Sequence, residues 1–470
     1  MISARLQRLK YVLADFISGN AGFLLFNIYR YRFLEADHNL GLGNFLTDSK
    51  IMAEQIAIPL MMLGVYWLSG YYNKPLKRSR LQEFLTTLFS GLFCTLLIYL
   101  GLLTNDQTLI VSTNYLMLFT LFALLFTPTY LVRLCITSYS IMRMRRREWK
   151  VPSIIVGATP EGAKMARRLQ DSRQNLGYEI VGFVPMDGEE PYPGLSAPVY
   201  GIDELAAIIP RLGVKQIFIA PTNASDRKVL DMVTRLYPLE TGVKIAPDTL
   251  DFVTSSIHLQ DIYGEPFVDL TSPKVSEASK NLKRLIDVVF SSVALALLAV
   301  PCAVIAILVK RSSTGPIIYR QERIGYRQRP FHILKFRTMR IDAEAGGPQL
   351  TGENDPRVTP IGRVLRKYRL DEVPQFWNVL RGEMSIVGPR PERDYFIRQI
   401  TERAPYYTLV HQVRPGITSW GMVKYGYAST LDQMVARTKY DLIYLSNMSI
   451  SVDFKIMIYT VKTVVTGRGK

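Results

Sequence analysis

The sequence predicts a membrane protein in three parts: an N-terminal four-helix transmembrane bundle, a middle Rossmann-like α/β domain, and a C-terminal α+β domain with a re-entrant membrane hairpin. Three observations predict this fold class. Four apolar stretches of membrane-spanning length open the chain. Short β-branched runs then alternate with helical ones. Finally, a fifth apolar run carries a proline near its middle and basic residues on both flanks.

Composition agrees with a chain that lies partly in a bilayer. Of its 470 residues, 48% are hydrophobic, which is high for a soluble protein. The formal net charge of +17 favours phosphate-rich partners: nucleic acid, anionic lipid headgroups or nucleotide substrates. The cysteines and histidines lack metal-ligand spacing, so the sequence indicates neither a disulfide framework nor a zinc site.

Residues 1–147 form the predicted bundle. Its spans cover roughly residues 11–29, 51–71, 81–103 and 114–139. Basic residues gather between the second and third spans and directly after the fourth, whereas the loop between the third and fourth has none. By the positive-inside rule, both ends of the bundle are expected to face the cytoplasm.

Residues 148–270 form the predicted Rossmann-like domain, in which parallel strands alternate with helices. Its first turn, GATPEG at residues 157–162, stands where a dinucleotide-binding turn would be but lacks the GxGxxG spacing. A scaffold for assembly or regulation is therefore favoured over a working cofactor site. A polar linker at residues 271–282 follows this domain.

The fifth apolar run, residues 285–309, opens the C-terminal domain of residues 283–470 and is long enough to cross a bilayer. A simple span would carry the basic C-terminal region to the outer face, against the positive-inside rule. Pro301 removes a backbone donor, so we expect it to break the run into two arms that enter and leave on one face. Hydropathy alone favours the alternative, an ordinary kinked span.

Two β-like runs, residues 317–323 and 331–339, predict a hairpin that presents Arg323, Lys335 and Arg337. Basic strands next to a membrane could simply hold anionic lipid. Further on, Arg390 and Arg414 lie in the stretches SIVGPRPE and VRPGITSW. Loops stiffened by Pro and Gly suit a bidentate grip on phosphate at low entropic cost.

A helix that begins at residues 359–360 and ends before Pro374 is expected to carry Asp371 and Glu372. On such a helix Lys367 and Asp371 would form a routine surface ion pair, which is the plain alternative. An aspartate among several cations, however, stays ionised and can attack phosphorus or bind Mg²⁺, while the cations neutralise phosphate oxygens. The carboxylate pair therefore predicts phosphoryl chemistry beside a membrane.

From about residue 283 to its end, the chain resembles the bacterial sugar transferases, the large monotopic phosphoglycosyl transferases that join a sugar phosphate to undecaprenyl phosphate. The matching motifs are KRLID, GPIIYRQERIG, KFRTM, ENDPRVT, LDEVPQFWNVLRGEMSIVGPRP and RPGIT. They occur in the right order over nearly the whole domain. The preceding bundle and Rossmann-like domain are similar to the long form of this family.

The resemblance implies transfer of a hexose 1-phosphate from a UDP-sugar to undecaprenyl phosphate, with release of UMP. Asp371 would attack the β-phosphorus and carry the sugar phosphate covalently, and it would also hold Mg²⁺. Glu372 would assist as an acid/base or positioning group. The resemblance assigns substrate phosphate binding to Lys335, Arg337, Arg366, Arg390 and Arg414.

The resemblance also implies a multi-pass protein of the bacterial inner membrane with its catalytic domain on the cytoplasmic face, in contact with membrane lipid. The reaction would be the first membrane step of exopolysaccharide, capsule or O-antigen synthesis, and a homodimer is compatible with the architecture. UDP-glucose is the expected donor and UDP-galactose the second choice. Two departures concern details: Val300 replaces a usual Ser before Pro301, and GITSWGMV replaces the usual GITGWAQV.

Other classes of protein explain less of the chain. A membrane-bound nucleotide-sugar dehydratase would share the front half, but the last third lacks a second NAD-binding glycine motif and a Tyr-x-x-x-Lys pair. A channel or sensor gated by the α/β domain would leave Asp371 and Glu372 unexplained. Nucleic-acid binding is disfavoured because the basic residues follow membrane edges and the motifs above.

Overall fold

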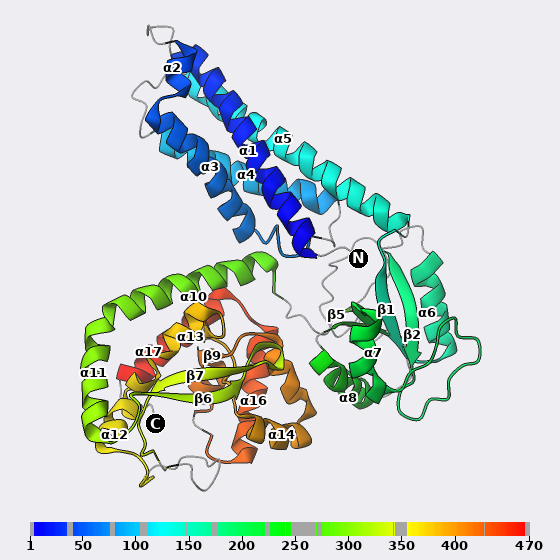
Figure 1. Cartoon of the computed structure of the whole chain (residues 1–470), viewed down its shortest axis with the longest axis vertical. Coiled ribbons are helices and arrows are strands. Elements are labelled where there is room, and N and C mark those ends of the chain that lie inside the picture. The colour runs from blue at the N-terminus through cyan, green and yellow to red at the C-terminus, as the bar shows by residue number, and fades with distance from the viewer. Residues whose placement is uncertain are drawn as a thin grey trace. The chain divides into compact units, whose positions relative to one another are not determined.

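The computed structural model describes residues 4–34, 41–75, 80–103, 111–146, 148–171, 177–220, 226–239, 241–245, 268–269, 275–341, 343, 355–426 and 428–465 (Figure 1). They group into two compact units. The first comprises Met1–Val151, Gln170–Tyr178 and Ser276–Leu282, and the second Pro152–Leu169, Glu179–Val275 and Lys283–Lys470. Residues 271–274 of the predicted linker and the first two residues of the ENDPRVT motif lie outside the described residues.

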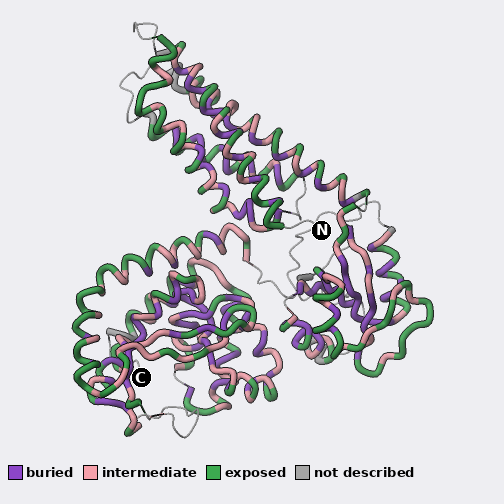
Figure 2. Tube along the Cα trace, viewed as in Figure 1, coloured by how far each residue is buried: buried purple, intermediate pink, exposed green. Residues whose placement is uncertain are grey.

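Long apolar helices form the first unit, as the sequence predicts. The described helices are α1 (Ala4–Leu34), α2 (Leu42–Leu46), α3 (Ser49–Leu68), α4 (Arg80–Leu103) and α5 (Val111–Arg145). Of these, α1, α3, α4 and α5 are long and apolar enough to cross a membrane. This part of the chain therefore has the four predicted spans, and their outward faces are largely exposed (Figure 2).

Helix α1 packs against α3 and α5, and α4 packs against α5. The approach of α1 to α5 is close, because a Cβ at Gly22 would lie 2.3 Å from the carbonyl oxygen of Leu124. The interior of the bundle is not entirely apolar. Asp15 and Arg133 form a doubly bonded ion pair inside the bundle, with both N···O distances at 2.7 Å. Arg133 has an exposed fraction of 0%.

The α/β region contains the predicted parallel sheet. Its described elements are β1 (Val151–Val156), α6 (Pro160–Asp171), β2 (Tyr178–Val184), η1 (Ile202–Glu204), α7 (Leu205–Leu212), β3 (Gln216–Ile219), α8 (Asp226–Leu236), η2 (Tyr237–Leu239), β4 (Gly242–Ile245) and β5 (Val268–Asp269). The strand order is β2-β1-β3-β4-β5. Strands β1, β3 and β4 pair in parallel, and β5 adds an antiparallel edge. Residues of β1 and β3 are almost all buried, so the core lies on this sheet (Figure 2).

The fifth apolar run forms two helices, α10 (Glu277–Leu297) and α11 (Ala299–Ser312). They are bent by 63° at the break around Leu298. Pro301, three residues later, lacks a donor for the carbonyl of Leu297, and its ring would clash with that carbonyl in a straight helix. The pair has the hydropathy of a membrane segment, so its geometry fits either a broken span or a re-entrant loop.

The C-terminal region combines small sheets with short helices. Strands β6 (Ile318–Ile324) and β7 (Pro330–Phe336) form the predicted antiparallel hairpin. The elements that follow are α12 (Pro360–Lys367), η4 (Leu370–Glu372), α13 (Gln375–Arg381), β8 (Ser385–Val387), α14 (Asp394–Arg403), η5 (Pro405–Gln412), β9 (Gly416–Thr418), α15 (Trp420–Lys424), α16 (Leu431–Ser446) and α17 (Ile450–Val465). Strands β8 and β9 pair in parallel. Side chains from β7, α13, β8, α16 and α17 share one apolar core.

Candidate active site

The expected continuous helix through the carboxylate pair is wrong, and the break changes the character of that pair. Helix α12 begins at a side-chain cap, where the Thr359 hydroxyl accepts a hydrogen bond from the Gly362 amide at 3.1 Å. It ends at Lys367, and Arg369 then adopts a left-handed backbone with φ of 52°. Asp371 and Glu372 follow in η4, with exposed fractions of only 8% and 9%. The pair is therefore buried, not a surface ion pair with Lys367.

Three cations surround Glu372. Lys335 on β7 donates from Nζ to Oε1 at 3.1 Å. Arg369 Nη1 lies 3.5 Å from Oε2, and Arg390 Nη1 lies 3.8 Å from Oε1. Burial alone would raise the pKa of Glu372, but the charges of these three neighbours outweigh it and hold the pKa well below its usual value. Glu372 therefore stays ionised and fixes the positions of the cations.

The neighbouring Asp371 has the opposite electrostatic balance. Burial and the negative charge of Glu372 raise its pKa to about 6, against the opposing charges of Lys335, Arg366 and Arg369. An ionised, desolvated carboxylate is a better nucleophile than a hydrated one. Above pH 6, Asp371 is thus a buried carboxylate with several cations nearby. Within the described structure, the close ion pairs of these cations are with Glu372 and not with Asp371.

A second buried acid holds further arginines of this region. Glu392 accepts from Arg437 Nη2 at 2.6 Å and from Arg323 Nη1 at 3.2 Å. Arg390 Nε lies 3.8 Å from the same carboxylate, so the Arg390 guanidinium lies between Glu372 and Glu392. Neither Glu392 nor Arg437 was expected at the site from the sequence. The signal for Glu392 was its place at the end of the PRPE motif; Arg437 has no motif of its own.

The other predicted phosphate-binding residues divide into two groups. Arg366 lies near enough for its charge to lower the pKa of Asp371, so it joins Lys335 and Arg390 around the carboxylate pair. Arg337 instead donates from Nη2 to the Ser313 carbonyl at 2.7 Å, just beyond the end of α11. Arg414 donates to the Gly382 carbonyl at 2.8 Å, at the end of α13. Lys335, Arg366 and Arg390 therefore act on the carboxylate pair, whereas the contacts described for Arg337 and Arg414 are with carbonyls near helix ends.

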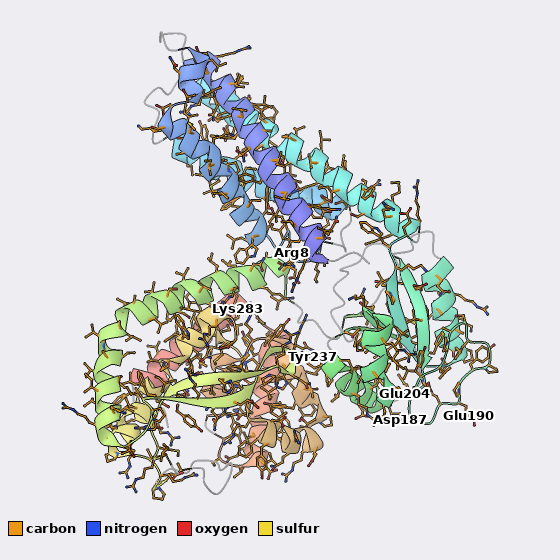
Figure 3. The ribbon with its side chains drawn as sticks, in the orientation of Figure 1. Arg8, Asp187, Glu190, Glu204, Tyr237 and Lys283 are labelled. Carbon is orange, nitrogen blue, oxygen red and sulfur yellow. The ribbon has the colours of Figure 1, made fainter. Side chains whose placement is uncertain are left out.

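The first motif, KRLID, ties α10 to the C-terminal core. Lys283, labelled in Figure 3, donates to Asp453 Oδ2 at 2.6 Å. Arg284 donates to the carbonyls of Val379 and Leu380 at the end of α13, at 2.7 and 3.0 Å. Asp287 accepts from the Ile386 amide at 3.1 Å. These contacts fix the apolar helix against the elements that follow the carboxylate pair in the chain.

Comparison with known proteins agrees with this geometry. The family described as "Bacterial sugar transferase" matches residues 278–467. The exopolysaccharide production protein PSS of Rhizobium leguminosarum bv. phaseoli is 38% identical over 196 residues, which are 40% of this chain and 97% of that one. The chain belongs to the bacterial sugar transferase family.

Two longer relatives extend the comparison of this bacterial sugar transferase. The UDP-N-acetylgalactosamine-undecaprenyl-phosphate N-acetylgalactosaminephosphotransferase of Aeromonas hydrophila is 40% identical over 188 residues, 40% of this chain and 44% of that one. The UDP-glucose:undecaprenyl-phosphate glucose-1-phosphate transferase of Escherichia coli (strain K12) is 35% identical over 290 residues, 61% of this chain and 62% of that one. The chain thus matches less than two thirds of the length of both.

A second family, described as "CoA-binding domain", matches residues 68–247 of this bacterial sugar transferase. The first turn of the α/β domain does not fit a pyrophosphate. Glu161 places a negative charge in the first turn of α6, where the helix dipole would otherwise favour an anion. The backbone amide of Tyr192 donates to the Ala158 carbonyl at 2.9 Å, so a neighbouring loop lies against the turn. A scaffold role for this domain stays a prediction.

The carboxylates at the site fit Mg²⁺ only together with substrate. Within the described ranges, no group of three His, Cys, Asp or Glu side chains could hold a metal ion. Mg²⁺ commonly binds one or two carboxylates and completes its shell with water and substrate phosphates. Glu372 is occupied by its three cations, so Asp371 is the carboxylate of the pair that remains for such an ion.

Replacing Glu392 with Gln is expected to lower the free energy of unfolding of this bacterial sugar transferase by about 1–3 kcal/mol. The amide keeps one acceptor oxygen but leaves the buried Arg437 and the half-buried Arg323 without this negative partner. Thermal unfolding in detergent measures the loss. Glu402→Gln makes the same chemical change at an exposed position on α14. This control should leave the unfolding temperature unchanged. Equal unfolding temperatures for Glu392→Gln and wild type would contradict this account of Glu392.

Proposed function

We propose that the protein transfers a hexose 1-phosphate from a UDP-sugar to undecaprenyl phosphate, giving the undecaprenyl-diphosphate sugar and UMP. The observation that carries the proposal is the buried Asp371–Glu372 pair, in which Glu372 holds Lys335, Arg369 and Arg390 while Asp371 remains available. The names of the relatives in Aeromonas hydrophila and Escherichia coli describe the same class of transfer. No feature of the described chain favours a channel, a sensor or a dehydratase.

Two displacements at phosphorus account for the transfer. In the first, a carboxylate oxygen of Asp371 bonds to the β-phosphorus of the UDP-sugar, and the bond to the bridging oxygen breaks. UMP leaves with that bond's electron pair. In the second, a phosphate oxygen of undecaprenyl phosphate bonds to the same phosphorus, and the acyl phosphate bond breaks to regenerate the Asp371 carboxylate. One phosphoanhydride replaces another, so the overall reaction is nearly balanced and reversible by UMP.

In this reaction an anionic carboxylate attacks an anionic phosphate, and the nearby cations reduce the repulsion between them. Lys335 and Arg390 are held by Glu372 and are preorganised before substrate binds, so little free energy goes into orienting them during reaction. Arg366 adds positive charge near Asp371. Because its pKa is lowered, Glu372 acts as the group that positions these cations and not as a proton donor.

Mg²⁺ is the proposed cofactor. Held by Asp371 and the substrate diphosphate, it would neutralise charge on the phosphate oxygens. Lys335, Arg366 and Arg390 act on the same oxygens by direct charge and hydrogen bonding.

We further propose that α10 and α11 form a re-entrant hairpin, so that the chain has four full spans and keeps its catalytic domain on the cytoplasmic face of the bacterial inner membrane. The 63° bend and the basic residues Lys310 and Arg311 at the end of α11 support this arrangement. In this arrangement the phosphate of the lipid and the soluble nucleotide reach the site from the same face of the membrane. A homodimer stays a prediction from the architecture.

The donor sugar is proposed as glucose, with galactose as the second choice. Residues 416–423, where the sequence departs from the family pattern, reach the site through Met422, whose Sδ lies 3.4 Å from Arg390 Nη1. A thioether is a weak acceptor, so the Met422 contact itself would compete only weakly with a substrate phosphate for Arg390. The relatives include an N-acetylgalactosamine 1-phosphate transferase, so N-acetylated sugars belong in the test.

Release of UMP tests the proposed function. The purified full-length protein is incubated with Mg²⁺, undecaprenyl phosphate and, in turn, UDP-glucose, UDP-galactose and their N-acetylamino counterparts. Release that depends on both one donor and the lipid would establish the reaction and name the sugar. If no donor gives UMP, the proposed function is wrong.

The rate should depend on pH through Asp371. Only the deprotonated carboxylate attacks, and burial raises its pKa to about 6, so kcat/KM for the UDP-sugar is expected to fall as the pH drops through 6. An ordinary exposed aspartate would keep its activity to about pH 4. A pH profile of kcat/KM, which reports groups of the free enzyme, distinguishes the two. A kcat/KM that stays constant down to about pH 4 would contradict the assignment of Asp371 as the titrating nucleophile.

A further inference from the structure

Arg390 lies at the same distance from two buried carboxylates of the C-terminal region. Its Nη1 is 3.8 Å from Glu372 Oε1, and its Nε is 3.8 Å from Glu392 Oε1. Both distances are longer than a hydrogen bond, so each carboxylate attracts the guanidinium without bonding to it directly. The position of the guanidinium therefore depends on the balance between two attractions.

Each of the two oxygens that face Arg390 already accepts a hydrogen bond from another cation. Glu372 Oε1 accepts from Lys335 Nζ at 3.1 Å, and Glu392 Oε1 accepts from Arg437 Nη2 at 2.6 Å. The bond between Arg437 and Glu392 is short and charge-assisted, and both side chains are buried, so it is a strong one. Arg437 therefore occupies the oxygen of Glu392 that Arg390 would otherwise reach.

The other oxygen of Glu392 has a partner of its own. Arg323 Nη1 donates to Oε2 at 3.2 Å, and its Nη2 donates to Gln321 Oε1 at 2.7 Å. Burial would raise the pKa of Glu392, but the charges of Arg437, Arg323 and Arg390 outweigh it and hold the pKa below its usual value. Because Arg323 is already bonded on both sides, Arg390 is the cation of this group that would replace Arg437 at Oε1.

Helix α15 packs against α16 at Arg437. A Cβ at Gly421 would lie 2.7 Å from Arg437 Cγ, so there is no spare room between the two helices. The Gly421 amide donates to Asp441 Oδ1 at 3.1 Å, one turn further along α16. Burial raises the pKa of Asp441 to about 6 against the opposing charge of Arg437. The packing of α15 and the two acids, Glu392 and Asp441, thus hold Arg437 in place.

We infer that Arg437 is a positioning residue for the transfer reaction: it occupies Glu392 Oε1 and so prevents this carboxylate from binding Arg390. Arg390 then keeps its place near Glu372, where its guanidinium can grip the diphosphate of the UDP-sugar. Arg437 acts through Arg390 and not on the substrate. This inference rests on the proposed function.

Loss of Arg437 should therefore move Arg390. A buried carboxylate that loses its ion-pair partner is costly, so Glu392 is expected to take a hydrogen bond from Arg390, whose Nε is only 3.8 Å away. This movement draws the guanidinium away from Glu372 and from a phosphate bound beside Asp371. A role in stability alone would instead lower the amount of active protein, and with it the apparent kcat, without changing the KM for the UDP-sugar.

Arg437→Met tests the inference in the full-length protein, with saturating undecaprenyl phosphate and the preferred UDP-sugar. Methionine cannot donate to Glu392, so the KM for the UDP-sugar should rise about tenfold, the effect of one weakened charged hydrogen bond. Adding Glu392→Gln removes the negative charge that would bind Arg390. The double variant should therefore have a lower KM than Arg437→Met alone, although it carries one more substitution.

A conservative variant and a matched control accompany this pair. Arg437→Lys keeps a positive charge beside Glu392 but lacks the planar fork of a guanidinium, so it should raise the KM by less than Arg437→Met. Arg403→Met removes an arginine from an exposed ion pair between α14 and α16, in which Arg403 Nη1 lies 2.5 Å from Asp432 Oδ1. This control should leave the KM unchanged.

The outcomes separate the inference from the proposed function. An unchanged KM in either Arg437→Lys or Arg437→Met would overturn the inference. Equal KM values for Arg437→Met with and without Glu392→Gln would overturn it as well. If the wild-type protein releases no UMP with any donor, the proposed function on which the inference rests is overturned instead.

Discussion

Replacement of Asp371 with Asn is expected to lower the rate of UMP release by about 10³-fold or more, the usual effect of removing a nucleophile. Asparagine has nearly the same shape, so the surrounding cations keep their places on Glu372, but its amide cannot form the acyl phosphate. The measurement is the initial rate of UMP release with undecaprenyl phosphate and the preferred UDP-sugar, at a pH about two units above 6 so that the wild-type carboxylate is ionised.

Asp394→Asn is the matched control for this experiment. Asp394 lies on α14 in an exposed ion pair with Arg398 at 2.6 Å, so the same chemical change there should leave the rate within about twofold of wild type. Normal turnover by Asp371→Asn would rule out Asp371 as the nucleophile. Equal losses in both variants would mean that the assay reports protein quality and not chemistry.

Replacement of Asp15 with Asn is expected to destabilise the bundle by about 3–5 kcal/mol, because it leaves a buried arginine without its counter-ion. Arg133 is fully buried and makes two of its hydrogen bonds to Asp15. Thermal unfolding in detergent micelles, followed by the loss of helical signal, should show a lower transition temperature than wild type.

The double replacement Asp15→Asn and Arg133→Met provides the control, because it removes both charges. Replacing a buried ion pair by groups of similar size often costs little, so the double variant should be more stable than Asp15→Asn alone. Equal destabilisation by the single and double variants would show that the charge of Arg133 is not the cause.

Local sequence patterns were sufficient for most elements of the fold. Spans and strands depend on runs of residue types within one segment, so the four apolar helices, the parallel sheet and the β6–β7 hairpin were predicted. The break between α12 and η4 was not. Arg369 is a non-glycine residue in a left-handed conformation, and nothing in the residues from 360 to 373 signals it.

The carboxylate pair and its nearest predicted cations, Lys335 and Arg390, were recognised because each belongs to a motif. Glu392 and Arg437 were missed because they are 45 residues apart and meet only through packing. Arg369 was missed at the site because a continuous helix would have pointed it elsewhere. Arg337 and Arg414 also belong to clear motifs; the contacts described for them are with carbonyls at the ends of α11 and α13, and their phosphate binding stays a prediction.

The polar interior of the bundle was invisible to hydropathy for the same reason. Asp15 and Arg133 are 118 residues apart, and each lies within an apolar stretch of its helix, away from the charged helix ends. A window of local hydropathy averages such a residue away, whereas pairing across helices determines its energy.

Trapping of a covalent sugar phosphate on Asp371 tests the central proposal most directly. The full-length protein is mixed with Mg²⁺ and a UDP-sugar labelled in the sugar, without undecaprenyl phosphate, and is quenched and digested for mass spectrometry. We expect up to one UMP per protein and label on the peptide that contains Asp371, with neither in Asp371→Asn. UMP release only when lipid is present, together with an unlabelled protein, would contradict the covalent route.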